Sequence, residues 1–179
     1  MSSETPTRIS GYRFKPEHLE IAGRKPGISA FMRIKNGEQF LEPTIRSHID
    51  HVDEIVAVYN GCTDRTEAIL VRLAREYGPK LRLFHYTDDV FPPGSTGHAK
   101  TDASAPSSLV NYSNFALAQT RYTIATKLDD DHLGIEPALT KMVAYIRSPE
   151  FRQGELAAFS GLNLAPSRER PGDIEVLLE

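Results

Sequence analysis

Residues 28–70 read ISAFMRIKNGEQFLEPTIRSHIDHVDEIVAVYNGCTDRTEAIL, and this stretch decides the fold class. Residues 28–34 form a short apolar run that ends at an Asn-Gly turn, which predicts a buried strand. Apolar residues at helical spacing over 38–49 predict a helix, and a second apolar run over 54–59 predicts another buried strand. A second helix, predicted over about residues 65–77 and stopped by Gly-Pro, repeats the strand and helix unit.

The rest of the chain continues this alternation of strands and helices. Further strands are predicted over 81–86, 122–128 and 156–160, and further helices over 108–120 and 136–147. Residues 87–107 are too long for a plain connector, so we expect either a lid over a ligand or a disordered segment there. The alternation predicts an α/β fold, a Rossmann-like and mostly parallel sheet with helices on both faces.

Composition indicates one globular domain in a reducing compartment. The chain has 179 residues, of which 40% are hydrophobic, enough for one sizeable core. We expect residues 1–27 to be a polar leader with one short turn near Pro16–Leu19, and residues 28–179 to form the domain. The net charge of −3 disfavours nucleic acid as a partner. A single cysteine and the lack of a long apolar segment predict a cytoplasmic protein with no integral membrane segment.

Polar residues follow the predicted strands, at the edge where ligands of parallel sheets bind. The most informative of them are Asp129–Asp131, three carboxylates that repel one another unless a cation or hydrogen bonds compensate. Hard cations such as Mg²⁺ accept carboxylate oxygens and share their coordination with substrate phosphates. Asp129 and Asp131 are therefore candidate metal ligands, and a solvated turn with a helix cap is the alternative interpretation.

Two stretches resemble the family 2-like GT-A glycosyltransferases, which are inverting enzymes. Residues 28–70 resemble the opening of that family, in which one strand leads to an Asn-Glu or Asn-Gly turn and the next to a loop like D-x-G-S-T-D-x-T. YSNFALAQTRYTIATKLDDDHL, residues 112–133, resembles its Asn-bearing helix, strand and D-x-D metal motif. The resemblance covers about residues 27–165 and implies a GT-A-type, nucleotide-diphospho-sugar transferase fold.

The resemblance also implies a role for each matching residue. The D-x-D carboxylates of the family hold Mn²⁺ or Mg²⁺ on the diphosphate, which corresponds to Asp129 and Asp131, with His132 as a further candidate ligand. Such a metal stabilises the negative charge that forms on the leaving diphosphate. The residues implied in nucleotide binding are Arg33, Lys35, Asn36, Tyr59, Asn60, Asp64, Asn114 and Asp130.

Two residues depart from the family's pattern, and a second asparagine lies near the one that matches it. Tyr59 stands where the family has the Asp that pairs with the pyrimidine, so we expect the base to stack on Tyr59 or to bond Asn60, with UDP as the nucleotide. Cys62 replaces the Ser of the loop, a small change in size and polarity. Asn111 lies three residues before Asn114 on one predicted helix, so both amides could face the phosphates.

The general base has no clear counterpart in this sequence. An inverting transfer needs a carboxylate that deprotonates the acceptor hydroxyl. Only 48 residues follow Asp131, and the acidic candidates among them are Glu155, Asp173 and Glu175. We therefore expect the acceptor side to be incomplete, as in a short or truncated member of the family.

Together these features predict a metal-dependent glycosyltransferase of the hexosyltransferase type. It is expected to transfer a sugar from a nucleotide diphosphate sugar, with UDP as the nucleotide, to a glycan or lipid-linked acceptor with inversion. The alternative is a non-catalytic protein that binds UDP and metal but lacks the general base. A nucleotidyltransferase is disfavoured, because FMRIKNGEQF at residues 31–40 contains no Gly-rich phosphate loop.

Overall fold

The computed structural model describes residues 5–20, 22–158, 163–166 and 174–177. The chain divides into two compact units, Met1–Ala144 and Tyr145–Glu179. The first unit contains a five-stranded sheet with helices against it, and the second contains a two-stranded sheet.

The five-stranded sheet is parallel throughout, with the strand order β1-β4-β3-β2-β5. Its register brings Ile34 beside Tyr59 and Phe31 beside Lys127, so neighbouring strands end at one common edge. The predicted α/β class with a parallel sheet is confirmed. The strands are β1 (Thr7–Ile9), β2 (Lys25–Ile34), β3 (Glu54–Asn60), β4 (Leu81–Tyr86) and β5 (Tyr122–Lys127).

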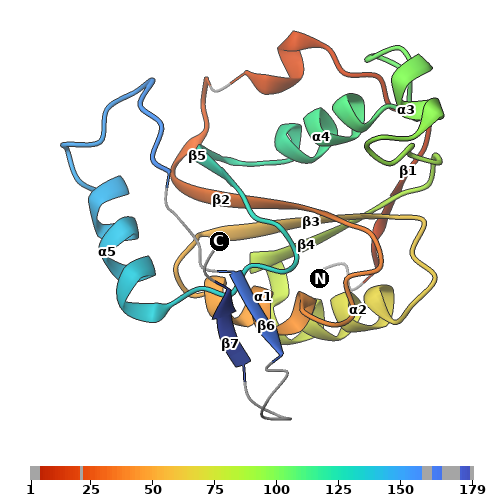
Figure 1. Cartoon of the computed structure of the whole chain (residues 1–179). Coiled ribbons are helices and arrows are strands. Elements are labelled where there is room, and N and C mark those ends of the chain that lie inside the picture. Colours follow the sequence, from red (N-terminus) through yellow and green to blue (C-terminus); the bar gives the residue numbers. More distant parts are fainter. Residues whose placement is uncertain (1–4, 21, 159–162, 167–173, 178–179) are drawn as a thin grey trace. The chain divides into compact units, whose positions relative to one another are not determined.

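Helices cover both faces of this sheet, as Figure 1 shows, with α4 on one side and α1 and α2 on the other. The side chain of Ser108 accepts a hydrogen bond from Val110 N and so caps α4, one of the two caps that the sequence suggests. The α-helices are α1 (Leu41–His48), α2 (Thr66–Tyr77), α3 (Thr96–Lys100), α4 (Leu109–Ala118) and α5 (Glu136–Ile146), and the 3-10 turns are η1 (Pro16–Leu19) and η2 (Gly78–Lys80).

The core lies on both faces of β3, which is buried along its whole length at the centre of the sheet. On the α4 face, one cluster joins Val56, Val58, Phe84, Tyr86, Val90, Tyr112, Phe115 and Ala116. On the other face, α1 buries Leu41 and Ile45, and α2 buries Leu70 and Leu73. Because burying one such aliphatic side chain is worth about 1.5–3 kcal/mol, these helices hold the strand ends in fixed positions.

The N-terminal segment contains more structure than the predicted leader. The turn expected near Pro16–Leu19 is present as η1, but Thr7–Ile9 form β1 and pair with β4. Ile9 also packs against the core cluster on the α4 face. Sequence patterns miss this strand because it is three residues long and mostly exposed, so that its pairing with β4 is what defines it.

Two further predictions differ from the structure. Residues 87–107 are neither one long loop nor wholly irregular, because α3 forms within them and the side chain of Ser95 caps it. The strand predicted over 156–160 is wrong for residues 156–158, which adopt no regular structure, and its last two residues lie outside the described part. In the second unit, β6 (Asn163–Pro166) and β7 (Ile174–Leu177) form an antiparallel pair instead.

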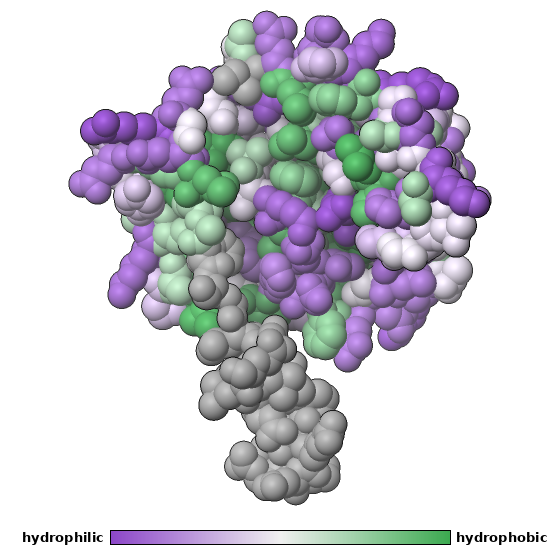
Figure 2. Space-filling view, turned by 45° about the horizontal axis from the view of Figure 1, so that its top comes forward, coloured by the Kyte–Doolittle hydropathy of each residue, from purple (hydrophilic) through white to green (hydrophobic). Residues whose placement is uncertain are grey.

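Figure 2 shows hydrophilic and hydrophobic side chains interspersed over one face of the molecule. Within the described ranges, each helix is too short or too polar to cross a bilayer.

Candidate functional site at the carboxyl edge of the sheet

The strand order creates a switch point at the carboxyl ends of β2 and β5. From β2 the chain adds β3 and β4 on one side, and β5 then pairs with the opposite side of β2. In open α/β sheets ligands bind outside the carboxyl ends of the strands where the order reverses in this way. Leu128 N still donates to Phe31 O at 3.0 Å, so the aspartates that follow leave the sheet beside the end of β2.

The turn after β2 is fastened to the turn after β3. Asn36 has a φ of 56°, in the left-handed region that Asn tolerates better than most residues. Its Oδ1 accepts a hydrogen bond from Thr63 N at 2.8 Å, and Gly37 N donates to Thr66 Oγ1 at 2.9 Å. The amide oxygen of Asn36 is thus engaged in holding the two turns together.

Asp64 and Glu38 complete this fastening. Asp64 Oδ1 accepts from Thr66 N and Oδ2 accepts from Glu38 N, both at 3.0 Å, while Glu38 Oε2 accepts from Arg65 N at 2.8 Å. Partial burial opposes the charge of Asp64, but the hydrogen bonds from Thr66 and Glu38 outweigh it and lower the pKa of the carboxyl. Asp64 therefore holds the turns after β2 and β3 together as a charged carboxylate.

Asp130 is the aspartate of the triplet that faces the turn after β2. A Cβ at Gly37 would collide with the Asp130 carboxylate, so the missing side chain of Gly37 is what lets the two segments approach. Burial raises the pKa of Asp130, and the negative charges of Asp131, Asp129 and Asp64 raise it further. Three neighbouring carboxylates thus oppose the ionisation of Asp130.

Asp129 and Asp131 differ in what surrounds them. The Lys127 ammonium lies 2.5 Å from Asp129 Oδ2, whereas Asp131 is exposed and has His132 Nε2 at 3.9 Å from its Oδ1. Over the described ranges, no three His, Cys, Asp or Glu side chains are gathered closely enough to hold a metal ion. The donors are of the oxygen type that Mg²⁺ and Mn²⁺ prefer, so their chemistry fits such an ion, but Lys127 occupies one of them.

Arg33 and Lys35 lie at the end of β2, and Asn114 lies on α4 next to a serine that bonds Arg33. Arg33 Nη1 donates to Ser113 Oγ at 2.7 Å, which ties the end of β2 to α4 beside Asn114. Lys35 is exposed just after β2, and Asn114 is half-buried on α4. Sequence reasoning did not single out Ser113, because a serine inside a helical pattern carries no signal of a cross-chain bond to an arginine.

Tyr59 and Asn60 do not present the groups expected for base recognition. Tyr59 is 1% exposed, its ring stacks on His85 at 4.6 Å between centroids, and its hydroxyl donates to Glu67 Oε1 at 2.8 Å. Burial, followed by Glu67, raises the pKa of Tyr59. The prediction that a base stacks on Tyr59 is therefore wrong for this structure. Tyr59 lies two residues after Ala57 in β3, so both side chains point to the same face of the sheet. This is the face that packs against α2, so the ring points away from the carboxyl edge.

Asn60 and Asn111 serve the fold. Asn60 is 3% exposed, and its Nδ2 donates to Tyr86 O at 2.8 Å and to a second backbone oxygen at 2.6 Å, so the donors expected to reach a base are engaged. Asn111 is fully buried, accepts from Phe14 N at 2.8 Å and donates to Tyr12 O at 2.9 Å. It therefore holds the N-terminal segment and does not face phosphates, which leaves Asn114 as the candidate on α4.

The candidate general bases belong to the second unit. Glu155 is exposed in the second unit, and its Oε2 accepts from Arg152 N at 2.9 Å. Asp173 lies outside the described residues. Glu175 lies in β7. Their role as bases stays a prediction.

Comparisons with known proteins give matches among solved structures. No family model matches the chain, and no curated protein matches its sequence. The chain is similar to S. aureus TarS 1-349, with 19% identity and a TM-score of 0.45, over 66% of this chain and 32% of that one. It is also similar to glucosyl-3-phosphoglycerate synthase from Mycobacterium tuberculosis in complex with Mg²⁺ and UDP, with 23% identity and a TM-score of 0.45, over 81% of this chain and 48% of that one.

This chain spans 32% of the length of the first and 48% of the length of the second.

Proposed function

We propose that the carboxyl edge of the sheet binds a nucleotide diphosphate sugar, with UDP as the nucleotide, and that the protein transfers the sugar with inversion to a glycan or lipid-linked acceptor. One observation carries the proposal. Asp129–Asp131 leave β5 beside the end of β2, at the switch point of the sheet, and one of them packs against the Gly37 turn. A carboxylate triplet in this place matches the D-x-D motif that the sequence resembles.

The aspartates would hold Mn²⁺ or Mg²⁺, which would stabilise the charge that develops on the leaving diphosphate. Asp131 is exposed and Asp129 is partly exposed, so both carboxylates are accessible to an ion from solvent. Lys127 must release Asp129 when the ion binds, because an ammonium 2.5 Å away competes for the same oxygen. The released Lys127 side chain is then close enough to the site to meet a phosphate oxygen.

The nucleotide would lie between the end of β2 and the start of the acidic turn. Arg33 and Lys35 supply positive charge there for the diphosphate, and Asp130 supplies a partly buried acceptor for a ribose or sugar hydroxyl. Asn114 adds an amide from α4, next to the serine that holds Arg33. With Tyr59 buried, recognition of the base falls to groups of the turns at this edge.

Calorimetry of UDP binding with and without Mn²⁺ tests the metal site. Asp131→Asn removes one charged ligand and should weaken Mn²⁺-dependent UDP binding about ten-fold, on the order of 1.4 kcal/mol. Asp50→Asn is the matched control, because Asp50 is 87% exposed beyond the end of α1, lies near Lys80 and loses the same charge. UDP binding of equal strength with and without Mn²⁺ would refute the metal site.

Transfer is tested separately from binding. The protein is incubated with Mn²⁺, a panel of UDP-sugars and glycan or lipid-linked acceptors, and released UDP is measured together with the anomeric configuration of the product. Product of inverted configuration supports the enzyme. Tight UDP binding without transfer or donor hydrolysis supports the alternative, a non-catalytic protein that binds UDP and metal.

A further inference from the structure

A pocket lies at the opposite edge of the sheet, where the strands begin. Its volume is about 370 Å³, and the residues that line it are Gly23, Lys25, Asp53, Pro79, Lys80, Arg121 and Tyr122. They precede or begin β2, β3, β4 and β5, so four neighbouring strands contribute to one concavity. A volume of this size is in the range of about 300–1,000 Å³ that small-molecule sites occupy.

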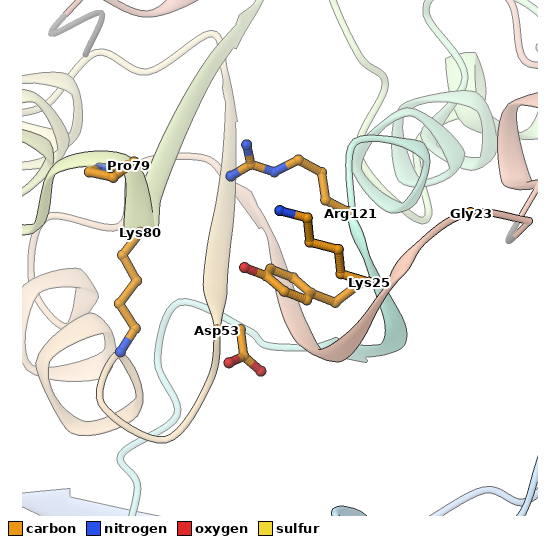
Figure 3. Close-up of a pocket in the computed structure, with 7 residues that line it drawn as sticks. Gly23, Lys25, Asp53, Pro79, Lys80 and Arg121 are labelled. Carbon is orange, nitrogen blue, oxygen red and sulfur yellow. The ribbon is translucent and has the colours of Figure 1, made fainter. Parts of the chain in front are cut away.

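The charge of this pocket is positive, in contrast to the net charge of the chain. Lys25, Lys80 and Arg121 supply three cations against the carboxylate of Asp53, whereas the whole chain has a net charge of −3. Figure 3 shows Lys25 and Arg121 extending side by side, with Asp53 and Lys80 across from them. The cations therefore come from separate strand starts and share one concavity.

The neighbouring carboxylates do not cancel this charge. Glu54 Oε2 lies 2.9 Å from Arg121 Nε, but it also lies 3.1 Å from Arg82 Nη1, so its charge is shared with a cation outside the pocket. Asp50 Oδ1 lies 3.9 Å from the Lys80 ammonium, at the outer limit of an ion pair, and its side chain is 87% exposed. Such an exposed pair contributes little, about 0–1 kcal/mol.

The backbone is shaped to bring the pocket walls together. Gly27 has a φ of 149°, and a Cβ there would lie 2.5 Å from Tyr122 Cδ1 and 2.7 Å from Asp53 Oδ2. Asp53 Oδ2 in turn accepts a hydrogen bond from Ile28 N at 2.8 Å, which fixes the carboxylate at the start of β3. The pocket thus has one wall that is fixed by a hydrogen bond and by close packing.

We propose that this amino-edge pocket binds a small phosphorylated molecule. A phosphoryl group carries two charges and several acceptor oxygens, so it can pair with the guanidinium of Arg121 and with both ammonium groups at once. Tyr122 and Pro79 supply apolar surface for the organic part of such a molecule. This site is separate from the nucleotide site, since the two lie at opposite ends of the same strands.

Amide chemical shifts of the full chain, titrated with inorganic pyrophosphate and with a sugar phosphate at low salt in EDTA, test the proposal. We expect saturable shifts at the amides of Gly23, Lys25, Lys80 and Tyr122. The Lys25→Gln/Lys80→Gln double variant should bind both probes roughly ten-fold more weakly, because it removes two of the three cations. If the sugar phosphate binds more tightly than pyrophosphate, Tyr122 and Pro79 contribute to recognition of the organic part. If the two probes bind equally, the phosphoryl group alone is recognised.

Lys141→Gln is the control for the loss of one lysine, because Lys141 is exposed on α5 and loses one positive charge far from the pocket residues in the sequence. An unchanged circular dichroism spectrum and melting temperature of the double variant would show that lost binding is not lost folding. Asp131→Asn should leave the amino-edge shifts unchanged, so failure of this proposal and failure of the nucleotide site are distinguishable. Absent shifts at these amides, or shifts that the double variant retains, would overturn the proposal.

Discussion

The amino and carboxyl edges of one sheet use charge in different ways. At the amino edge Glu54 is fully buried, and Arg82 and Arg121 lie against its carboxylate. At the carboxyl edge Asp131 is exposed and Asp129 meets the flexible ammonium of Lys127. Buried charge with several fixed partners contributes to holding the strands, whereas exposed charge with one mobile partner is available to a ligand. We therefore expect mutation of the buried Glu54 at the first edge to change stability, and mutation of the exposed aspartates at the second edge to change binding.

The largest expected effect is the loss of stability in Glu54→Gln. Glu54 Oε1 accepts from Ser29 Oγ and from Arg121 N, both at 2.7 Å, so the carboxylate joins β2, β3 and the start of β5. Removing its charge takes the carboxylate away from Arg82 and Arg121, although Arg82 still donates to Gln119 O, and breaking a buried ion pair costs about 3–5 kcal/mol. Since Arg121 is 54% exposed, we expect about 3 kcal/mol, the lower end of that range, in urea unfolding.

Glu76→Gln is the matched control for this prediction. Glu76 binds Arg46 across α1 and α2 on the surface, where water replaces a lost partner. Its free energy of unfolding should stay close to that of the wild-type protein. Equal effects of the two variants would contradict the contrast between buried and exposed charge.

A smaller effect is expected in the pH dependence of stability. Burial alone would raise the pKa of Glu54, but the bonds from Ser29 and Arg121 and the charge of Arg82 outweigh it, so the folded-state pKa is lowered. A lowered folded pKa means that stability is fully present above the unfolded value of about 4.3 and is lost as the pH falls through the folded pKa.

Asp130 should act with the opposite sign. Its folded-state pKa is raised, so its contribution is greatest below the unfolded value of about 3.9 and is lost as the pH rises through the folded pKa. Urea unfolding from pH 3 to pH 7 should therefore show a flatter acid limb in Glu54→Gln and a gain in stability near neutral pH in Asp130→Asn. A stability loss in Asp130→Asn at neutral pH would contradict the raised pKa of Asp130.

The sequence reveals those features that depend on local pattern. IVAVY at residues 55–59 is an uninterrupted run of apolar and aromatic residues, and the structure buries β3 along its whole length. The acidic triplet follows a predicted strand, so its place at the carboxyl edge follows from the parallel order that alternating elements require. These two features are enough to locate the candidate site.

Features that depend on tertiary contacts escape the sequence. Tyr59 ends a strand next to polar residues, but the alternation of side chains along β3 sends its ring toward α2 and Glu67. Asn111 and Asn114 look alike on a helical pattern, and the backbone of residues 12–14, far away in the chain, is what buries Asn111. The amino-edge pocket is assembled from the starts of four strands and has no contiguous motif.

Lys127→Gln has the smallest expected effect and sharpens the contrast most directly. The Lys127 side chain is 48% exposed and that of Asp129 is 35% exposed, so their ion pair is of the surface type, worth about 0.2–1 kcal/mol. Because a metal ion must displace the ammonium from Asp129, the variant should bind Mg²⁺ alone roughly two- to five-fold more tightly in calorimetry.

Lys141→Gln controls for the change in net charge. Any gain in Mg²⁺ affinity that it shows comes from the electrostatic field of the whole protein and not from Asp129. Measuring Mg²⁺ with UDP present then separates two roles of Lys127. A gain that persists with UDP means that the lysine acts only as a competitor for Asp129. A gain with Mg²⁺ alone that reverses with UDP means that the displaced ammonium binds the diphosphate, and unchanged Mg²⁺ affinity would show that Asp129 is not a metal ligand.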